Sequence, residues 1–126
     1  MPTNIDQLLI ISQAGRLRDS LRVLLKSCYP LAAIEETETS ASALQFRYAS
    51  QQILVFLDAG LPEDQFWQTL EQIRQGSASQ HCVVLAHTLE QQKQAQGAGA
   101  QVVLLDGFTV ESLCAAVEAA VQVRLR

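Results

Sequence analysis

The sequence predicts an α/β fold with five parallel strands in one sheet and helices on both faces, a three-layer doubly wound arrangement. Short apolar runs alternate with segments whose apolar residues recur at helical spacing. One run, Ile53–Asp58, is rich in branched and aromatic residues and ends in a carboxylate, which is typical of a strand buried on both faces. Only short loops separate the segments, so right-handed crossovers between parallel strands are expected.

The first part of the chain predicts a strand, a helix and a second strand. Gln7–Ile11 is an apolar run that suits a buried strand. From Gly15 the leucines recur on one helical stripe until Pro30 stops the helix. Residues 31–35 form a shorter and more polar strand, as expected at a sheet edge.

The middle of the chain predicts two helices around the strand Ile53–Asp58. Ser40 is placed to cap a helix that continues to Tyr48. Pro62 suits the first turn of the next helix, which is expected to end at Gly76.

The last part of the chain predicts two further strand–helix units. A strand is expected at residues 81–86, and Thr88 with Gln91 has the spacing of a capping box that starts a polar helix. A fifth strand is expected at residues 101–105, and Thr109 is placed to cap the last helix. The chain thus predicts one domain over residues 1–126.

Composition excludes several classes of protein. Hydrophobic residues make up 48% of the 126 residues and charged residues 17%, which excludes disorder. The net charge of −4 gives no reason to expect direct binding to nucleic acid or to a membrane. No signal peptide is recognised, and three widely spaced cysteines predict buried, reduced thiols in a cytoplasmic protein: Cys28, Cys82 and Cys114. No cysteine–histidine cluster indicates a metal site.

Asp58 is the first candidate functional residue because it ends the predicted central strand. In an open parallel sheet, ligands bind in the crevice beyond the carboxyl ends of the strands. Leu61-Pro62 opens a helix shortly after Asp58, and Gly99-Ala100 precedes the last strand. With this order and spacing, the whole chain resembles a response-regulator receiver domain of two-component signalling. The resemblance implies a flavodoxin-like sheet of strand order 2-1-3-4-5, with Asp58 at the phosphoacceptor position.

The remaining residues of the family's phosphorylation site are replaced. Receivers carry two acidic Mg²⁺ ligands where this chain has Ser12 and Gln13, a Thr or Ser where it has Ala86, and a Lys where it has Asp106. Phosphoryl transfer needs cations and donors around the developing charge, and neutral oxygens suit Mg²⁺ poorly. At an effective dielectric of about 20, a phosphorylated Asp58 about 5 Å from Asp106 would be repelled by roughly 3 kcal/mol. We therefore expect a degenerate receiver that lacks phosphotransfer chemistry, bound Mg²⁺, any other cofactor and enzymatic activity.

Several alternatives remain at this crevice. Asp58 can be a residual phosphoacceptor, which predicts phosphate incorporation that Asp58→Asn removes. It can also be an inherited carboxylate that nearby backbone N–H groups cap or that bonds to Ser12 or Gln13. Asp58 and Asp106 can form a paired-carboxylate acid/base site, although no nucleophile accompanies them. His87 can pair with either Asp or be a solvated loop residue. The crevice can also hold a small ligand, which predicts a thermal shift with a metabolite.

Four cations on the first predicted helix form a candidate surface for a protein partner: Arg16, Arg18, Arg22 and Lys26. They are either a solvated flank whose long stems cover the core edge or a docking surface. The resemblance implies that the first helix belongs to the face that meets histidine kinases and phosphotransfer proteins. We therefore expect a module that binds a kinase, phosphotransfer or output protein independently of phosphorylation. A homodimer is compatible with the sequence but is not indicated by it.

Overall fold

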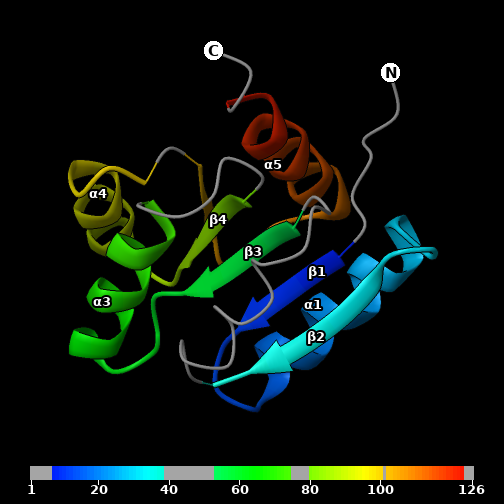
Figure 1. Ribbon diagram of the computed structural model, residues 1–126, viewed down its shortest axis with the longest axis horizontal. Coiled ribbons are helices and arrows are strands. Elements are labelled where there is room, and N and C mark those ends of the chain that lie inside the picture. Colours follow the sequence, from blue (N-terminus) through cyan, green and yellow to red (C-terminus); the bar gives the residue numbers. More distant parts are fainter. Residues whose placement is uncertain (1–6, 39–52, 75–79, 101, 124–126) are drawn as a thin grey trace.

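The computed structural model describes residues 7–38, 53–74, 80–100 and 102–123. These residues form one five-stranded parallel sheet of order β2-β1-β3-β4-β5 (Figure 1). The fold class and strand order predicted from the sequence are therefore confirmed. The strands are β1 (Gln7–Ile11), β2 (Ala33–Thr37), β3 (Ile53–Asp58), β4 (Gln80–Ala86) and β5 (Val103–Leu105).

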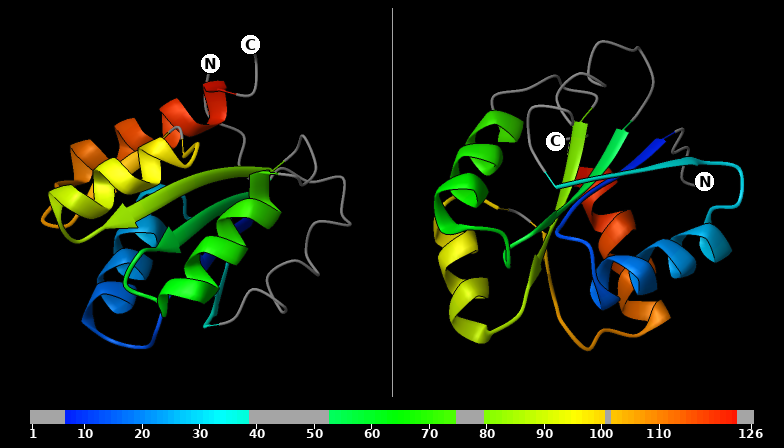
Figure 2. Two further views of the ribbon diagram at one scale, coloured as in Figure 1. Left: turned by 90° about the vertical axis from the view of Figure 1, so that its left-hand side faces the viewer. Right: turned by 90° about the horizontal axis from the view of Figure 1, so that it is seen from below.

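Helices cover both faces of the sheet. Figure 2 shows α3 and α4 on one side and α1 and α5 on the other. The helices are α1 (Arg16–Cys28), α3 (Glu63–Arg74), α4 (Leu89–Gly97) and α5 (Val110–Val123). The helix predicted from Ser40 to Tyr48 lies outside the described residues. In the part of the chain that the structure describes, none of the helices has the length and apolar character needed to cross a membrane.

Strand alternation sends neighbouring residues of the central strands into two separate cores. In β3, Leu54 and Phe56 pack on the side of α1 and α5, whereas Val55 and Leu57 pack on the side of α3 and α4. All residues of β3 are buried, as its unbroken apolar run predicts. Because both faces of the sheet are covered, the strand register is fixed, and this register places Asp58 at the carboxyl end of β3.

The second strand begins two residues later than the sequence predicts. We expected residues 31–35, but β2 is Ala33–Thr37 and Leu31 is 99% exposed. The residues after α1 form a turn, in which the Ala32 amide donates to the Tyr29 carbonyl (3.2 Å). The apolar character of Leu31 thus predicted a strand residue where the chain is still turning.

The predicted helix caps of α4 and α5 are confirmed, with one difference. Thr88 Oγ1 accepts from the Gln91 amide, and Thr109 Oγ1 accepts from the Ser112 amide, both at 3.1 Å. A capping box would return the Gln91 side chain to the Thr88 amide. Instead Gln91 Oε1 accepts from the amide of His87 (2.8 Å) and so anchors the loop after β4.

Candidate functional site

The candidate site lies where the carboxyl ends of the strands meet. Asp58 ends β3, Ala86 ends β4, and Ser12 directly follows β1. Asp106 directly follows β5, and its amide donates to the Ala86 carbonyl (2.8 Å). The parallel topology therefore gathers the predicted residues along one edge of the sheet, as the sequence indicated. Gln13 also follows β1, and it is exposed, unlike Ser12.

Asp58 is buried, and both oxygens of its carboxylate are engaged. Its exposed fraction is 6%. Oδ2 accepts a hydrogen bond from the Ser12 hydroxyl at 2.6 Å. Oδ1 accepts from the Gly60 amide at 2.8 Å and lies 2.6 Å from His87 Nε2. A buried carboxylate is stabilised by such donors, which replace the water lost on burial.

His87 lies between the two carboxylates of the site. Its Nε2 contacts Asp58 Oδ1, and its Nδ1 lies 3.7 Å from Asp106 Oδ2. An ionised carboxylate can only accept, so the ring donates to Asp58 through Nε2–H. The separation from Asp106 exceeds hydrogen-bond length, and the Asp106 side chain is 54% exposed. Of the two alternatives for His87, pairing therefore holds, and the partner in direct contact is Asp58.

Gly60 completes the enclosure of the carboxylate. A Cβ at this position would lie 2.9 Å from His87 Nε2 and 3.1 Å from Asp58 Oδ1. The turn after β3 therefore packs its backbone directly against the contact between these two side chains. Sequence reasoning missed this role, although a glycine two residues after a strand-end aspartate was its signal.

The arrangement does not form a serine–histidine pair. The Ser12 hydroxyl is buried and donates to Asp58 Oδ2 instead of the imidazole, so the histidine that activates a nucleophilic serine in such a pair is not in contact with it. Ala86 is buried and offers no donor to a phosphoryl group. Among the residues that the structure describes, no group of three or more His, Cys, Asp or Glu side chains is placed to hold a metal ion. The expectations of no catalysis and no Mg²⁺ stay predictions.

The cations of α1 divide into two kinds. Arg18 Nε lies 3.1 Å and Arg22 Nη1 lies 2.9 Å from the carboxylate of Glu36 in β2. The hydrogen bond and charge of Glu36 raise the pKa of Arg22 above its usual value. By contrast, Arg16 and Lys26 are exposed. Arg18 and Arg22 thus join α1 to β2, a structural role that the sequence did not predict, and the docking role stays a prediction.

Arg18 also connects this ion pair to the candidate site. Its Nη1 donates to the Ser12 carbonyl at 3.1 Å, and Ser12 in turn donates to Asp58. The Ser12 amide donates to the Thr37 carbonyl (2.9 Å), so the residue is held from both sides. Glu36 and Arg18 therefore position Ser12. Of these two residues the sequence singled out only Arg18, as part of either a solvated flank or a docking surface.

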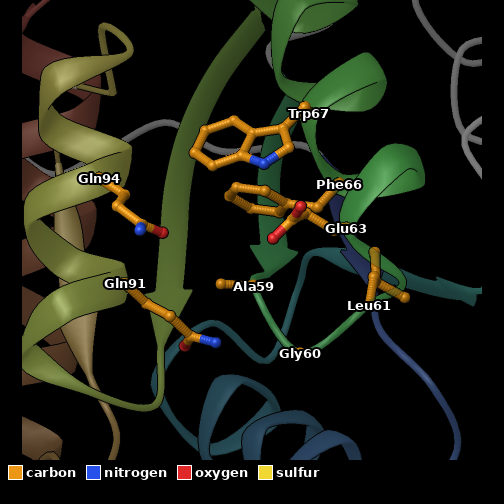
Figure 3. Close-up of a pocket in the computed structure, with 8 residues that line it drawn as sticks. All are labelled: Ala59, Gly60, Leu61, Glu63, Phe66, Trp67, Gln91 and Gln94. Carbon is orange, nitrogen blue, oxygen red and sulfur yellow. The ribbon is translucent and has the colours of Figure 1, made fainter.

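A pocket of about 220 Å³ lies beside the site, between α3 and α4. Figure 3 shows the rings of Phe66 and Trp67 extending from α3 towards α4, with Glu63 beside them. The two rings pack edge to face with centroids 4.7 Å apart. The backbone at Gly60 borders both this pocket and the Asp58 site. A carboxylate and aromatic faces around one hollow are the features that bind organic cations.

Comparisons with known proteins support the fold. No family model matches the sequence, and no curated protein matches it. A response-regulator receiver domain protein from Methanospirillum hungatei JF-1 has a TM-score of 0.72 and 16% identity, with 95% of this chain and 96% of that chain covered. A response regulator receiver protein from Burkholderia phymatum gives a TM-score of 0.68 and 17% identity, covering 90% and 95% of the two chains.

A third solved structure carries a different name. It is described as an adenylate cyclase from Rhodopirellula baltica, and it has a TM-score of 0.73 and 17% identity, with 97% of this chain and 90% of that chain covered. At these identities the likeness shows the fold and not the activity. The chain therefore has the receiver fold that the sequence predicts, and its function is argued from its site.

Proposed function

We propose that this chain is a receiver-like protein-interaction module of two-component signalling that works without phosphorylation of Asp58. The observation that carries the proposal is the occupation of both Asp58 oxygens by Ser12, Gly60 and His87. A receiver switches when its acyl phosphate recruits new contacts. Here both oxygens of the carboxylate already accept from groups of the protein itself.

Charge and space both disfavour a phosphoryl group at this carboxylate. Phosphoryl transfer requires an approach to a carboxylate oxygen and cations around the developing charge. The His87 ring occupies the approach to Oδ1, and Oδ2 is held by the buried Ser12 hydroxyl. The neighbouring Asp106 carboxylate adds negative charge instead of the family's lysine. Phosphorylation would have to displace these groups without gaining a metal cradle.

The first prediction is that Mg²⁺ with beryllofluoride or acetyl phosphate produces no response that depends on Asp58. Intact mass is expected to stay unchanged with acetyl phosphate. Amide NMR shifts near β3 and β4 are expected to be the same with Mg²⁺ alone and with Mg²⁺ plus beryllofluoride. The physical reason is that both carboxylate oxygens are engaged.

Asp58→Asn is the matched control, because it keeps the size of the side chain and removes the nucleophile. A mass increase or a set of shifts in the natural chain that disappears in Asp58→Asn would overturn phosphorylation independence. It would support the alternative that Asp58 remains a phosphoacceptor. The same experiment with a receiver that has the family's acidic Mg²⁺ ligands and lysine verifies that the reagents are active.

The second prediction concerns the partner surface on α1. Reversing charge at exposed Arg16 and Lys26 is expected to weaken binding of a kinase, phosphotransfer or output protein about tenfold or more, since steering and contact both depend on charge. Binding is measured by biolayer interferometry, and thermal unfolding should remain unchanged. Arg18 and Arg22 are unsuitable for this test because their reversal would also break the pairs with Glu36.

Charge reversal at exposed positions on two other helices, Arg74→Glu on α3 and Lys93→Glu on α4, is the control for net charge. Arg74 pairs with the exposed Glu71 (3.0 Å), so thermal unfolding of this double variant is measured as well. Equal losses in both double variants would show that only overall charge matters. Unchanged binding in the α1 variant would place the partner elsewhere and would favour the solvated-flank alternative.

The pocket between α3 and α4 supports a second candidate function, a sensor for a small organic cation. Glu63 supplies a carboxylate and Trp67 an aromatic face, and Gln91 and Gln94 extend from α4 towards them (Figure 3). A ligand there would touch Gly60, whose backbone contacts Asp58. A saturable change in Trp67 fluorescence with an ammonium or guanidinium compound, absent in Glu63→Gln, would favour this candidate.

A further inference from the structure

Two cysteines from distant parts of the chain meet between α1 and α5. Cys28 is the last residue of α1, and Cys114 lies in the second turn of α5. Their Sγ atoms are 3.5 Å apart, although the residues are separated by 86 positions in the sequence. Both are free thiols and both are half-buried. Figure 2 shows that the two helices lie on the same side of the sheet.

The surroundings of Cys114 favour its protonated thiol. Burial raises the pKa of Cys114 above its usual value, and the hydrogen bond and charge of Cys28 raise it further. Glu118 and Glu111, also on α5, act in the same direction. Tyr29 packs beside the thiols, and burial raises its pKa to about 12, with a smaller contribution from Cys114. The charged groups that act on Cys114 are thus negative, and they favour its protonated thiol.

We propose that Cys28 and Cys114 are an oxidisable thiol pair that closes to an intramolecular disulfide when a small disulfide such as oxidised glutathione is present. One protein thiolate attacks a sulfur of the glutathione disulfide, forms a mixed disulfide and releases one glutathione thiolate. The second protein thiolate then attacks the protein sulfur of that mixed disulfide and releases the second glutathione. Each glutathione takes up one thiol proton, so the protein loses two hydrogens and the reagent is reduced.

The second of these steps is the one that the structure favours. A disulfide needs a sulfur separation of about 2.05 Å, so the two atoms have to approach by roughly 1.5 Å from contact. The resolving thiol is already in contact with the sulfur that would carry glutathione, and closure competes well with a second external thiol. The mixed disulfide is therefore expected to be transient.

Closure has a consequence for the molecule. The bond would join the end of α1 to α5 across the side of the sheet that holds Phe56, and it would close a long segment of chain. Restricting the unfolded chain in this way is expected to raise the melting temperature on the order of 5–10 °C. It would also fix the end of α1, where the exposed Lys26 lies two residues before Cys28.

The test uses the full chain incubated with oxidised or reduced glutathione at pH 8, then blocked with N-ethylmaleimide in denaturant, so that Cys82 also reacts, and weighed intact. Oxidised glutathione is expected to remove two hydrogens and leave one blocked thiol, and peptide mapping is expected to join residues 28 and 114. The melting temperature should rise, and a reductant should reverse the rise.

Single serine variants separate the pair from the third cysteine. Cys82→Ser should still close the disulfide, because Cys82 lies in β4 and is not one of the paired thiols. Burial raises the pKa of the Cys82 thiol to about 12, so this thiol is not expected to react with glutathione at pH 8. Cys28→Ser and Cys114→Ser should stop at a stable glutathione adduct or remain unmodified, and neither should gain thermal stability. Three results would each overturn the proposal. They are stable glutathione adducts on both cysteines of the natural chain, a disulfide between two chains, and the absence of any reaction in a chain shown to be folded.

Discussion

The Phe56→Ala variant is expected to lose about 3–5 kcal/mol of unfolding free energy. Phe56 is fully buried at the centre of β3, and its ring lies in the core between the sheet and the helices α1 and α5. Its register partners on the two neighbouring strands, Ile10 and Val83, are fully buried as well. A truncated side chain would therefore leave a cavity that neither strand can fill. Because a domain of this size has only about 5–15 kcal/mol of stability, this single change can bring it close to unfolding.

Urea denaturation followed by circular dichroism measures the loss, and Phe108→Ala is the matched control. Phe108 packs on the same core but is only partly buried. The identical chemical change should therefore cost markedly less there. Equal losses at the two positions would contradict the buried centre of β3, and with it the register that places Asp58 at the end of the sheet.

Most of the fold could be predicted because it depends on local patterns. The apolar run of β3, the helical spacing of the α1 leucines and the caps at Thr88 and Thr109 each report on a few neighbouring residues. The start of β2 could not be placed in this way. Leu31 has the apolarity of a strand residue but lies in the turn after α1, where it is exposed.

Sheet topology allowed the sequence to predict which residues gather at the candidate site, but not how their side chains pair. Parallel strands with known order bring the residues at their carboxyl ends together, so Asp58 and Ser12 were expected as neighbours. The position of the His87 ring depends on how Gln91 anchors the loop and how closely Gly60 approaches. Neither contact leaves a periodic signal in the sequence. The sequence therefore could not decide whether His87 pairs with an aspartate or is a solvated loop residue.

The role of Arg18 shows the same limit for charged residues. Helical spacing placed Arg18, Arg22 and Lys26 on one stripe of α1, which indicated a cationic surface. Arg18 and Arg22 share a partner, Glu36, which belongs to β2, and only the packing of α1 on that edge of the sheet brings it within 3.1 Å of Arg18. Three cations that look equivalent in the sequence therefore differ in the structure: Arg18 and Arg22 are paired with Glu36, and Lys26 is exposed.

The Asp58→Ala variant is expected to lose about 2–3 kcal/mol of unfolding free energy, whereas Asp58→Asn should lose about 1 kcal/mol. Alanine removes the acceptor for the Ser12 hydroxyl, the Gly60 amide and His87 Nε2–H. Asparagine keeps one acceptor oxygen for Gly60 and His87. Its amide group can donate to Ser12, whose hydroxyl can turn to the Gln13 carbonyl, 3.3 Å away.

Urea denaturation at pH 7 compares the two variants with the natural chain, and NMR of the His87 ring supplies a second readout. A slowly exchanging Nε2–H signal is expected in the natural chain, because this proton lies in a 2.6 Å contact with a buried carboxylate. The signal should disappear in Asp58→Ala. Gly60→Ala should perturb the same signal without removing the acceptor, since its Cβ would press on the ring.

The sign of the Asp58→Ala effect separates the two possible roles of this carboxylate. A phosphoacceptor kept free for chemistry has few partners to lose, and its removal relieves the burial of a charge, so stability would stay constant or rise. A carboxylate that holds Ser12, Gly60 and His87 together instead loses stability when it is removed. A stable Asp58→Ala protein with an unchanged His87 ring signal would therefore contradict the closed site on which phosphorylation independence rests.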